Sequence, residues 1–165
     1  MHKEILNLSA VPILVTGADR FALEFTSKIL HGFGAKTLHV AETGQDAKRM
    51  IEHAKIELLI GDFSLSDMDG LEFIRWVRGL KEERTRSIPI IALCGYTGLP
   101  RIKLALAAGA DIILNKPVSP QGLYDSITRI THSSRHTIDT HYHAPSNASA
   151  QDTLILTSHS PTPAV

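Results

Sequence analysis

Short apolar runs alternate with amphipathic stretches from about residue 11 to residue 130. The first apolar run covers residues 11–16. Apolar residues then recur at every fourth position, at Phe21, Phe25 and Ile29, until glycines interrupt the pattern. A short apolar run followed by a period near four is typical of a strand followed by a helix. The chain is therefore expected to open with this pair of elements.

The same pair recurs four more times along the chain. The further strands are expected at 37–40, 58–62, 89–94 and 111–114, and the further helices at 45–54, 70–77, 99–108 and 119–130. The last helix has Ser119 as its N-cap and Pro120 in its first turn, both favoured at those places. Five strands that alternate with five helices predict a parallel sheet with helices on both faces, which is a doubly wound α/β fold.

The composition changes after residue 131. The remaining residues are rich in Ser, Thr, His and Pro and carry only Arg135, Asp139 and Asp152 as formal charges. One apolar run, residues 154–156, is too short to build a core. We therefore divide the chain into an N-terminal extension (1–10), a domain (11–131) and a tail that we expect to be disordered (132–165).

Charge and cysteine content narrow the function classes. There are 17 Lys and Arg against 17 Asp and Glu, so the formal net charge is +0, which disfavours electrostatic binding to nucleic acid or to a membrane. The single cysteine, Cys94, excludes an intramolecular disulfide and a zinc site built on thiolates. No run of 18 apolar residues and no convincing signal peptide occur, so we expect a soluble cytoplasmic protein.

Candidate chemistry gathers at the expected strand ends. In a doubly wound sheet the ligand crevice lies beyond the carboxyl ends of the strands. Asp62 ends the third strand, Cys94 ends the fourth and Lys116 follows the fifth. An aspartate there can accept a phosphoryl group as a nucleophile, and a nearby ammonium group can stabilise the added charge.

Three segments resemble the receiver domains of two-component response regulators. They are 58–72 (LLIGDFSLSDMDGLE), 88–93 (IPIIAL) and 108–117, which runs from AGAD to Lys116-Pro117. The resemblance covers roughly residues 11–130 and implies a flavodoxin-like (βα)5 fold with strand order 2-1-3-4-5. It also implies that Asp62 is the phosphoacceptor, that Lys116 is the lysine that pairs with the phosphoryl group, and that the Lys116–Pro117 bond is cis.

The chain departs from the family pattern at the metal site. Family members hold Mg²⁺ with an acidic pair directly after the first strand, and Gly17 and Ala18 stand there instead. The remaining ligands would be Asp62, the backbone at Ser64 and Asp19, one position late. The sequence therefore predicts a weak or absent Mg²⁺ site.

Three further departures affect the switch machinery. Cys94 replaces the family's switch Thr or Ser, Ile113 replaces its aromatic switch residue, and Leu65-Ser66 replaces Met-Pro. The chain is therefore expected to be an atypical single-domain member.

Two functions follow from these residues. The first is a response regulator that takes a phosphoryl group on Asp62 from a histidine kinase or a histidine phosphotransfer protein. It would signal to a downstream protein target, or form a homodimer, through the fourth helix, fifth strand and fifth helix. The alternative is a degenerate receiver that docks partners independently of phosphorylation. Neither function is that of an enzyme, and neither involves nucleic acid or a membrane.

Several sequence features can be explained by packing or solvation as well as by a functional role. Cys94 at the end of a buried strand is more often a packing residue than a redox sensor. Trp76, one position off an apolar stripe, is either an exposed contact point or half-buried. The charged run 81–86 is expected to be a solvated loop. The tail histidines at 132, 136, 141 and 143 favour a solvated tail over a metal site.

Overall fold

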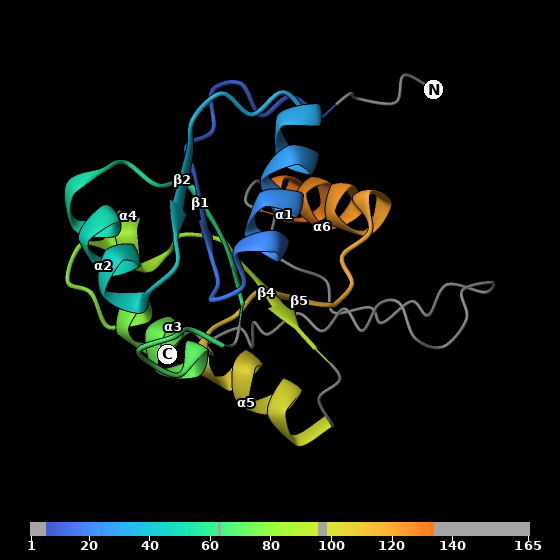
Figure 1. Ribbon diagram of the computed structural model, residues 1–165. Helices are drawn as coiled ribbons and strands as arrows, with labels where there is room; N and C mark the ends of the chain where they lie inside the picture. Colours follow the sequence, from blue (N-terminus) through green and yellow to red (C-terminus); the bar gives the residue numbers. More distant parts are fainter. Residues whose placement is uncertain (1–5, 63, 96–98, 134–165) are drawn as a thin grey trace, which may run out of the picture.

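Five parallel strands form one sheet in the order β2-β1-β3-β4-β5. Figure 1 labels β1, β2, β4 and β5 of this sheet. The strands are β1 Ile13–Thr16, β2 Leu38–Ala41, β3 Leu58–Asp62, β4 Ile90–Cys94 and β5 Ile112–Asn115. This computed structural model describes residues 6–62, 64–95 and 99–133. The strand order and the parallel pairing confirm the expected fold class.

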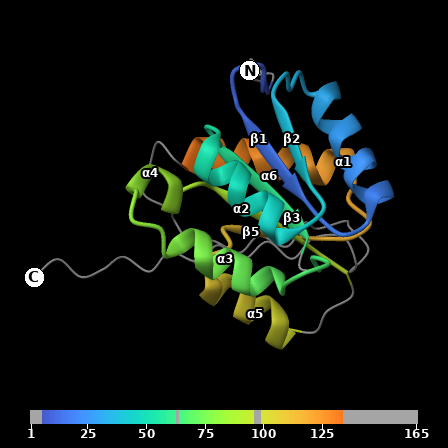
Figure 2. The same ribbon diagram turned by 60° about the vertical axis from the view of Figure 1, so that its left-hand side comes forward.

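Helices cover both faces of the sheet. They are α1 Arg20–Gly32, α2 Gly44–His53, α3 Gly70–Arg78, α4 Glu83–Arg86, α5 Leu99–Ala108 and α6 Pro120–Ser133. In Figures 1 and 2, α1 and α6 lie side by side on one face, whereas α2, α3 and α5 lie on the other. The expected helices correspond to α1, α2, α3, α5 and α6.

The short helix α4 lies where a solvated loop was expected, and that expectation was wrong. Its charged residues face solvent, but Thr85 is buried. The Thr85 hydroxyl donates to Glu82 Oε2 at 3.0 Å. A helix of one turn that buries a single residue shows no repeat of apolar positions, so the sequence pattern does not predict it.

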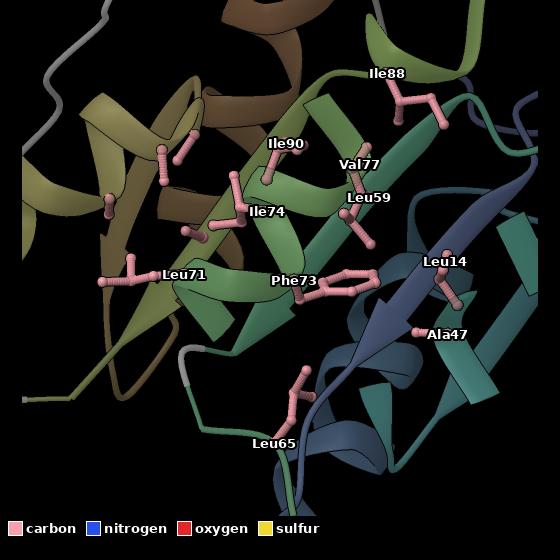
Figure 3. Packing of buried hydrophobic residues seen from close by; sticks show 14 of the residues in the cluster. Leu14, Ala47, Leu59, Leu65, Leu71, Phe73, Ile74, Val77, Ile88 and Ile90 are labelled. Carbon is pink, nitrogen blue, oxygen red and sulfur yellow. The ribbon is translucent and has the colours of Figure 1, made fainter. Parts of the chain in front are cut away.

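The core on the α2, α3 and α5 side is built from alternate strand residues. Leu14, Leu59 and Ile90 belong to this cluster, because successive side chains of a strand point to opposite faces. Figure 3 shows them beside the buried residues of α3, which include Phe73. The apolar stripe expected on α3 is confirmed, since Leu71, Ile74 and Val77 are all buried. Trp76 is half-buried and stacks on Phe73, with 6.2 Å between the ring centroids.

The second cluster joins the opposite face of the sheet to α1 and α6. Leu123, Ile127 and Ile130 of α6 are buried in it, as expected. The Phe21-Phe25-Ile29 period that indicates α1 is not the face that α1 buries. Phe21 is 78% exposed and Phe25 is 44% exposed. The buried residues of the helix are Leu23, Thr26 and Leu30.

Arg78, at the end of α3, links that helix to two other segments of the chain, residues 86–88 and 109–111. Its guanidinium donates to the carbonyl oxygens of Gly109, Arg86 and Ile88 at 3.0, 2.7 and 2.7 Å. It also pairs with Asp111 Oδ2 at 2.9 Å, and the same oxygen accepts the Ile90 N–H at 2.8 Å. Burial lowers the pKa of Arg78, and the attraction of Asp111 opposes that shift. This network fixes α3 against β4 and the start of β5.

Gly109 ends α5 with a backbone conformation that requires glycine. Its φ is +117°, and an added Cβ would lie 2.6 Å from Arg78 Cγ. The same residue therefore lets the chain turn into β5 and leaves room for the Arg78 side chain.

Both ends of the domain contain residues packed beyond the expected core. Leu8 is buried in the α1–α6 cluster, and its N–H donates to the Phe33 carbonyl at 3.4 Å. His132 and Ser133 belong to α6 rather than to the expected tail. The rest of that tail, including the histidines at 136, 141, 143 and 159, lies outside the described residues. In the part of the chain that the structure describes, no helix combines the length and apolar character needed to cross a bilayer.

Candidate functional site

Asp62 and Lys116 meet at the carboxyl edge of the sheet. Asp62 ends β3, and Lys116 directly follows β5. The Lys116 Nζ donates to Asp62 Oδ2, and the Ser64 N–H donates to Asp62 Oδ1 at 3.2 Å. The Asp62 side chain is only 11% exposed, whereas that of Lys116 is 31% exposed. The ammonium group therefore neutralises a carboxylate that is largely withdrawn from water.

The backbone holds Lys116 in this position. Its N–H donates to the Cys94 carbonyl at 2.6 Å, which continues the β4–β5 ladder by one residue. The Lys116–Pro117 peptide bond is cis, as the resemblance implied.

The end of β1 lies beside Asp62 but brings no carboxylate to it. A Cβ added at Gly17 would lie 3.3 Å from Asp62 Cβ. The Ala18 N–H donates to the Ser64 carbonyl at 3.3 Å. Asp19 is the N-cap of α1, and its Oδ1 accepts the N–H groups of residues 21 and 22 at 2.9 and 3.3 Å. Asp19 is therefore engaged in starting a helix.

These donors do not fit a Mg²⁺ site. Mg²⁺ needs near-octahedral oxygen coordination and is usually bound through one or two carboxylates together with waters. Here Asp62 is paired with Lys116, the Ser64 carbonyl accepts a backbone N–H, and Asp19 caps α1. Among the described residues there is no group of three or more His, Cys, Asp or Glu side chains able to hold a metal ion.

The expected switch residues, Cys94 and Ile113, are buried side chains. Both belong to the cluster on the α2, α3 and α5 side. The Cys94 Sγ donates to Asn115 Oδ1 at 3.2 Å, a weak bond for a thiol. Asp62, by contrast, lines a pocket on the opposite side of the sheet.

The loop after β3 is anchored to α2 by an aspartate. Asp67 accepts the N–H groups of Gly44 and Gln45 at 2.6 and 3.0 Å. The hydrogen bond from Gly44 holds the pKa of Asp67 below its ordinary value of 3.8. Asp67 is therefore an ionised cap for α2 near neutral pH, which fixes the loop that follows the candidate phosphoacceptor.

An open pocket of about 490 Å³ lies beside the ion pair. We call it the α1 pocket. Asp62 and Lys116 line it together with mainly apolar residues: Val15, Phe21, Ala22, Leu23, Phe25, Leu93, Pro117 and Val118. The sequence pattern does not reveal this pocket. Its one signal is the aromatic pair Phe21 and Phe25, whose spacing by itself indicates only a helix.

Two polar residues at strand ends were also missed. Asn115 accepts the hydrogen bond from Cys94, and Thr16 ends β1. Within the described residues, Thr16 Oγ1 is buried and has no hydrogen-bond partner. In the sequence, each of these two residues is recognisable only as a polar residue at the end of an apolar run.

An aspartate that ends β3 and a lysine that follows β5, in a parallel sheet of order 2-1-3-4-5, define the class of CheY-like domains with the flavodoxin fold. The family model described as "Response regulator receiver domain" matches residues 13–128. The chain therefore belongs to the response regulator receiver family.

Two relatives match this chain over most of their own length. The "Uncharacterized 14.6 kDa protein in sodA1 3'region" of Leptolyngbya boryana is 33% identical over 113 residues, 68% of this chain and 84% of that protein. The chemotaxis protein CheY1 of Helicobacter pylori is 30% identical over 99 residues, 59% of this chain and 78% of that protein. The match to the transcriptional regulatory protein GlrR of Escherichia coli covers only 19% of that longer protein.

Solved structures agree with the fold. A CheY-like receiver domain protein from Methanospirillum hungatei superimposes with a TM-score of 0.67 at 28% identity, over 76% of this chain and 97% of that one. Receiver domains are signalling modules of two-component systems and are not typically enzymes. They interact with histidine kinases and downstream targets. They commonly bind Mg²⁺ at the phosphorylation site.

Proposed function

We propose that this protein is a response regulator that accepts a phosphoryl group on Asp62. The observation that carries the proposal is the ion pair between Asp62 and Lys116 at the open edge of the sheet. A partly buried carboxylate beside a fixed ammonium group, and next to a pocket, matches what a phosphoacceptor needs.

The donor would be the phosphohistidine of a histidine kinase or a histidine phosphotransfer protein. An Asp62 carboxylate oxygen attacks phosphorus, the P–N bond breaks, and the bond electrons stay on the histidine nitrogen. The product is an acyl phosphate that carries more negative charge than the carboxylate did. Lys116 exchanges its bond to Asp62 for one to a phosphoryl oxygen and so stabilises that charge.

We further propose that the response leaves through protein contacts on the α5–β5–α6 face. Leu99 and Leu104 of α5 are 60% and 49% exposed and would offer apolar contacts to a protein partner. This face would bind a downstream protein target or a second copy of the chain. The proposed setting is the cytoplasm, with residues 11–131 as the receiver domain and no role for nucleic acid.

The test is direct phosphorylation of the full chain by acetyl phosphate, read by intact mass. We expect the protein to gain one phosphoryl group, and Asp62→Asn to gain none, because the amide is not a nucleophile. Asp125→Asn changes an exposed carboxylate on α6 in the same way and should leave the gain intact. No gain by the unmodified chain would overturn the proposal in favour of phosphorylation-independent docking. If Asp62→Asn gained a phosphoryl group as fully as the unmodified chain, another residue would be the phosphoacceptor.

A second experiment tests the shortage of metal donors. Ala18→Asp restores one carboxylate of the family's acidic pair, and we expect it to lower the Kd for Mg²⁺ at least about tenfold, since a second carboxylate adds a strong oxygen ligand. The measurement is a Mg²⁺ titration followed by the amide resonances of residues 62 and 64. Ala107→Asp, the same change at an exposed position of α5, should have no effect. If the original chain and Ala18→Asp bound Mg²⁺ with equal affinity, the conclusion that this site lacks metal-binding carboxylates would be wrong.

A further inference from the structure

The α1 pocket presents an apolar surface that the described chain leaves open. Phe21 and Phe25 lie one turn apart on α1 and remain 78% and 44% exposed. Pro117 and Val118, just before α6, also line it. Its charged lining residues are Lys116, Asp62 and Asp19; Lys116 pairs with Asp62, and Asp19 caps α1. The rest of the lining is mainly apolar, so an apolar segment suits this pocket.

The chain itself contains such a segment. Residues 154–156 read Leu-Ile-Leu, the longest uninterrupted run of large apolar side chains after Ser133. The residues around it are mostly Ser, Thr, His and Pro, and Asp152 is the only formal charge within ten positions on either side. Its composition is therefore complementary to the walls of the α1 pocket.

The length of chain between domain and segment fits this pairing. The pocket wall at Val118 precedes α6, and the tail leaves from the other end of that helix, which at 14 residues is about 21 Å long. The stretch 134–153 is about 20 residues long, for which a flexible linker has a root-mean-square length of about 25 Å. A linker whose typical length matches the span gives an effective concentration of about 1 mM or more. Even a weak affinity of residues 154–156 for the α1 pocket is then enough for the segment to dock.

We propose that Leu154, Ile155 and Leu156 dock in the α1 pocket of the same molecule. The docked segment would cover the exposed rings of Phe21 and Phe25 on α1, and docking is independent of phosphorylation.

The test places a nitroxide spin label on the full chain at Ser158→Cys, two residues beyond the segment. Native Cys94 is fully buried, so the label attaches selectively at position 158. We expect the oxidised label to cause a loss of amide intensity at Phe21 and Val118. The amide of Arg75, on α3 across the sheet, should keep its intensity.

Two sets of variants decide the interpretation. Replacing all three apolar residues (L154S, I155S and L156S) should restore the intensities at the pocket, and so should Phe21→Ser, which changes an exposed residue. Leu104→Ser on the opposite layer is the matched control and should leave the loss in place. Equal broadening in the chain and in the triple variant would overturn the proposal. So would the same broadening in unlabelled protein mixed with spin-labelled protein, because the occupant would then be the tail of a second copy.

Discussion

Replacing Lys116 with methionine is expected to slow phosphoryl gain at Asp62 by a factor of about 10²–10³, the usual cost of removing one fixed donor to a developing negative charge. Lys116 is the ammonium group paired with Asp62. Methionine keeps much of the side-chain volume but cannot bond a phosphoryl oxygen. The rate is measured by intact mass after mixing with acetyl phosphate, at several donor concentrations.

The control for this experiment is Lys103→Met, which removes an exposed ammonium group on α5. It should leave the rate within about twofold, because exposed charges are screened by water and salt. Denaturant unfolding of both variants separates a lost contact from a lost fold. A Lys116→Met protein that is folded and gains phosphoryl groups at the original rate would show that the lysine only supports the structure.

Replacing Arg78 with methionine is expected to lower the free energy of unfolding by about 3 kcal/mol. The change leaves Asp111 without its ion pair and three backbone carbonyls without the guanidinium donor. This value is at the low end of the range expected when one partner of a buried ion pair is removed, because the side chains of Arg78 and Asp111 are still 23% and 21% exposed. Denaturant titration of the full chain measures it.

Arg75→Met is the matched control, since Arg75 lies on the same helix and is exposed. It should change the stability by no more than about 0.5 kcal/mol. Arg78→Lys should recover only part of the loss, because one ammonium group cannot donate to carbonyls in several directions as a guanidinium does. A loss below about 1 kcal/mol for Arg78→Met would mean that the network contributes little to stability.

These expectations bear on how an atypical receiver could work. The described residues retain the carboxylate and the ammonium group but supply no acidic pair beside them. If Asp62 is the phosphoacceptor as proposed, stabilisation of the charge that develops during transfer depends more heavily on Lys116. The large effect expected for Lys116→Met and the metal affinity expected for Ala18→Asp are two consequences of the same shortage of donors.

The sequence alone determined the order of elements and the two principal site positions. Short apolar runs and apolar periods of nearly four, with glycine and proline as stops, placed the five strands and the five main helices. The stripe Leu123-Ile127-Ile130 was recognisable because it is the only apolar face of its helix. Asp62 and Lys116 could be paired in advance because the carboxyl ends of parallel strands meet at one edge of the sheet.

Only the tertiary structure decided how α1 is rotated on the sheet. Two apolar faces compete on this helix, and packing against β1 buries the one with Leu23 and Leu30. That choice leaves Phe21 and Phe25 exposed over a pocket. Local sequence cannot rank two such faces, because the free energy of burying either depends on the shape of the partner surface.

The same limit applies to Asp19 and to Arg78. The sequence places Asp19 one position beyond the family's acidic pair, but the backbone of α1 decides that its carboxylate caps the helix. The partners of Arg78 come from segments up to 33 residues away. Hydrogen bonds have direction and short range, so whether distant groups meet is fixed only when the packed layers have set their positions.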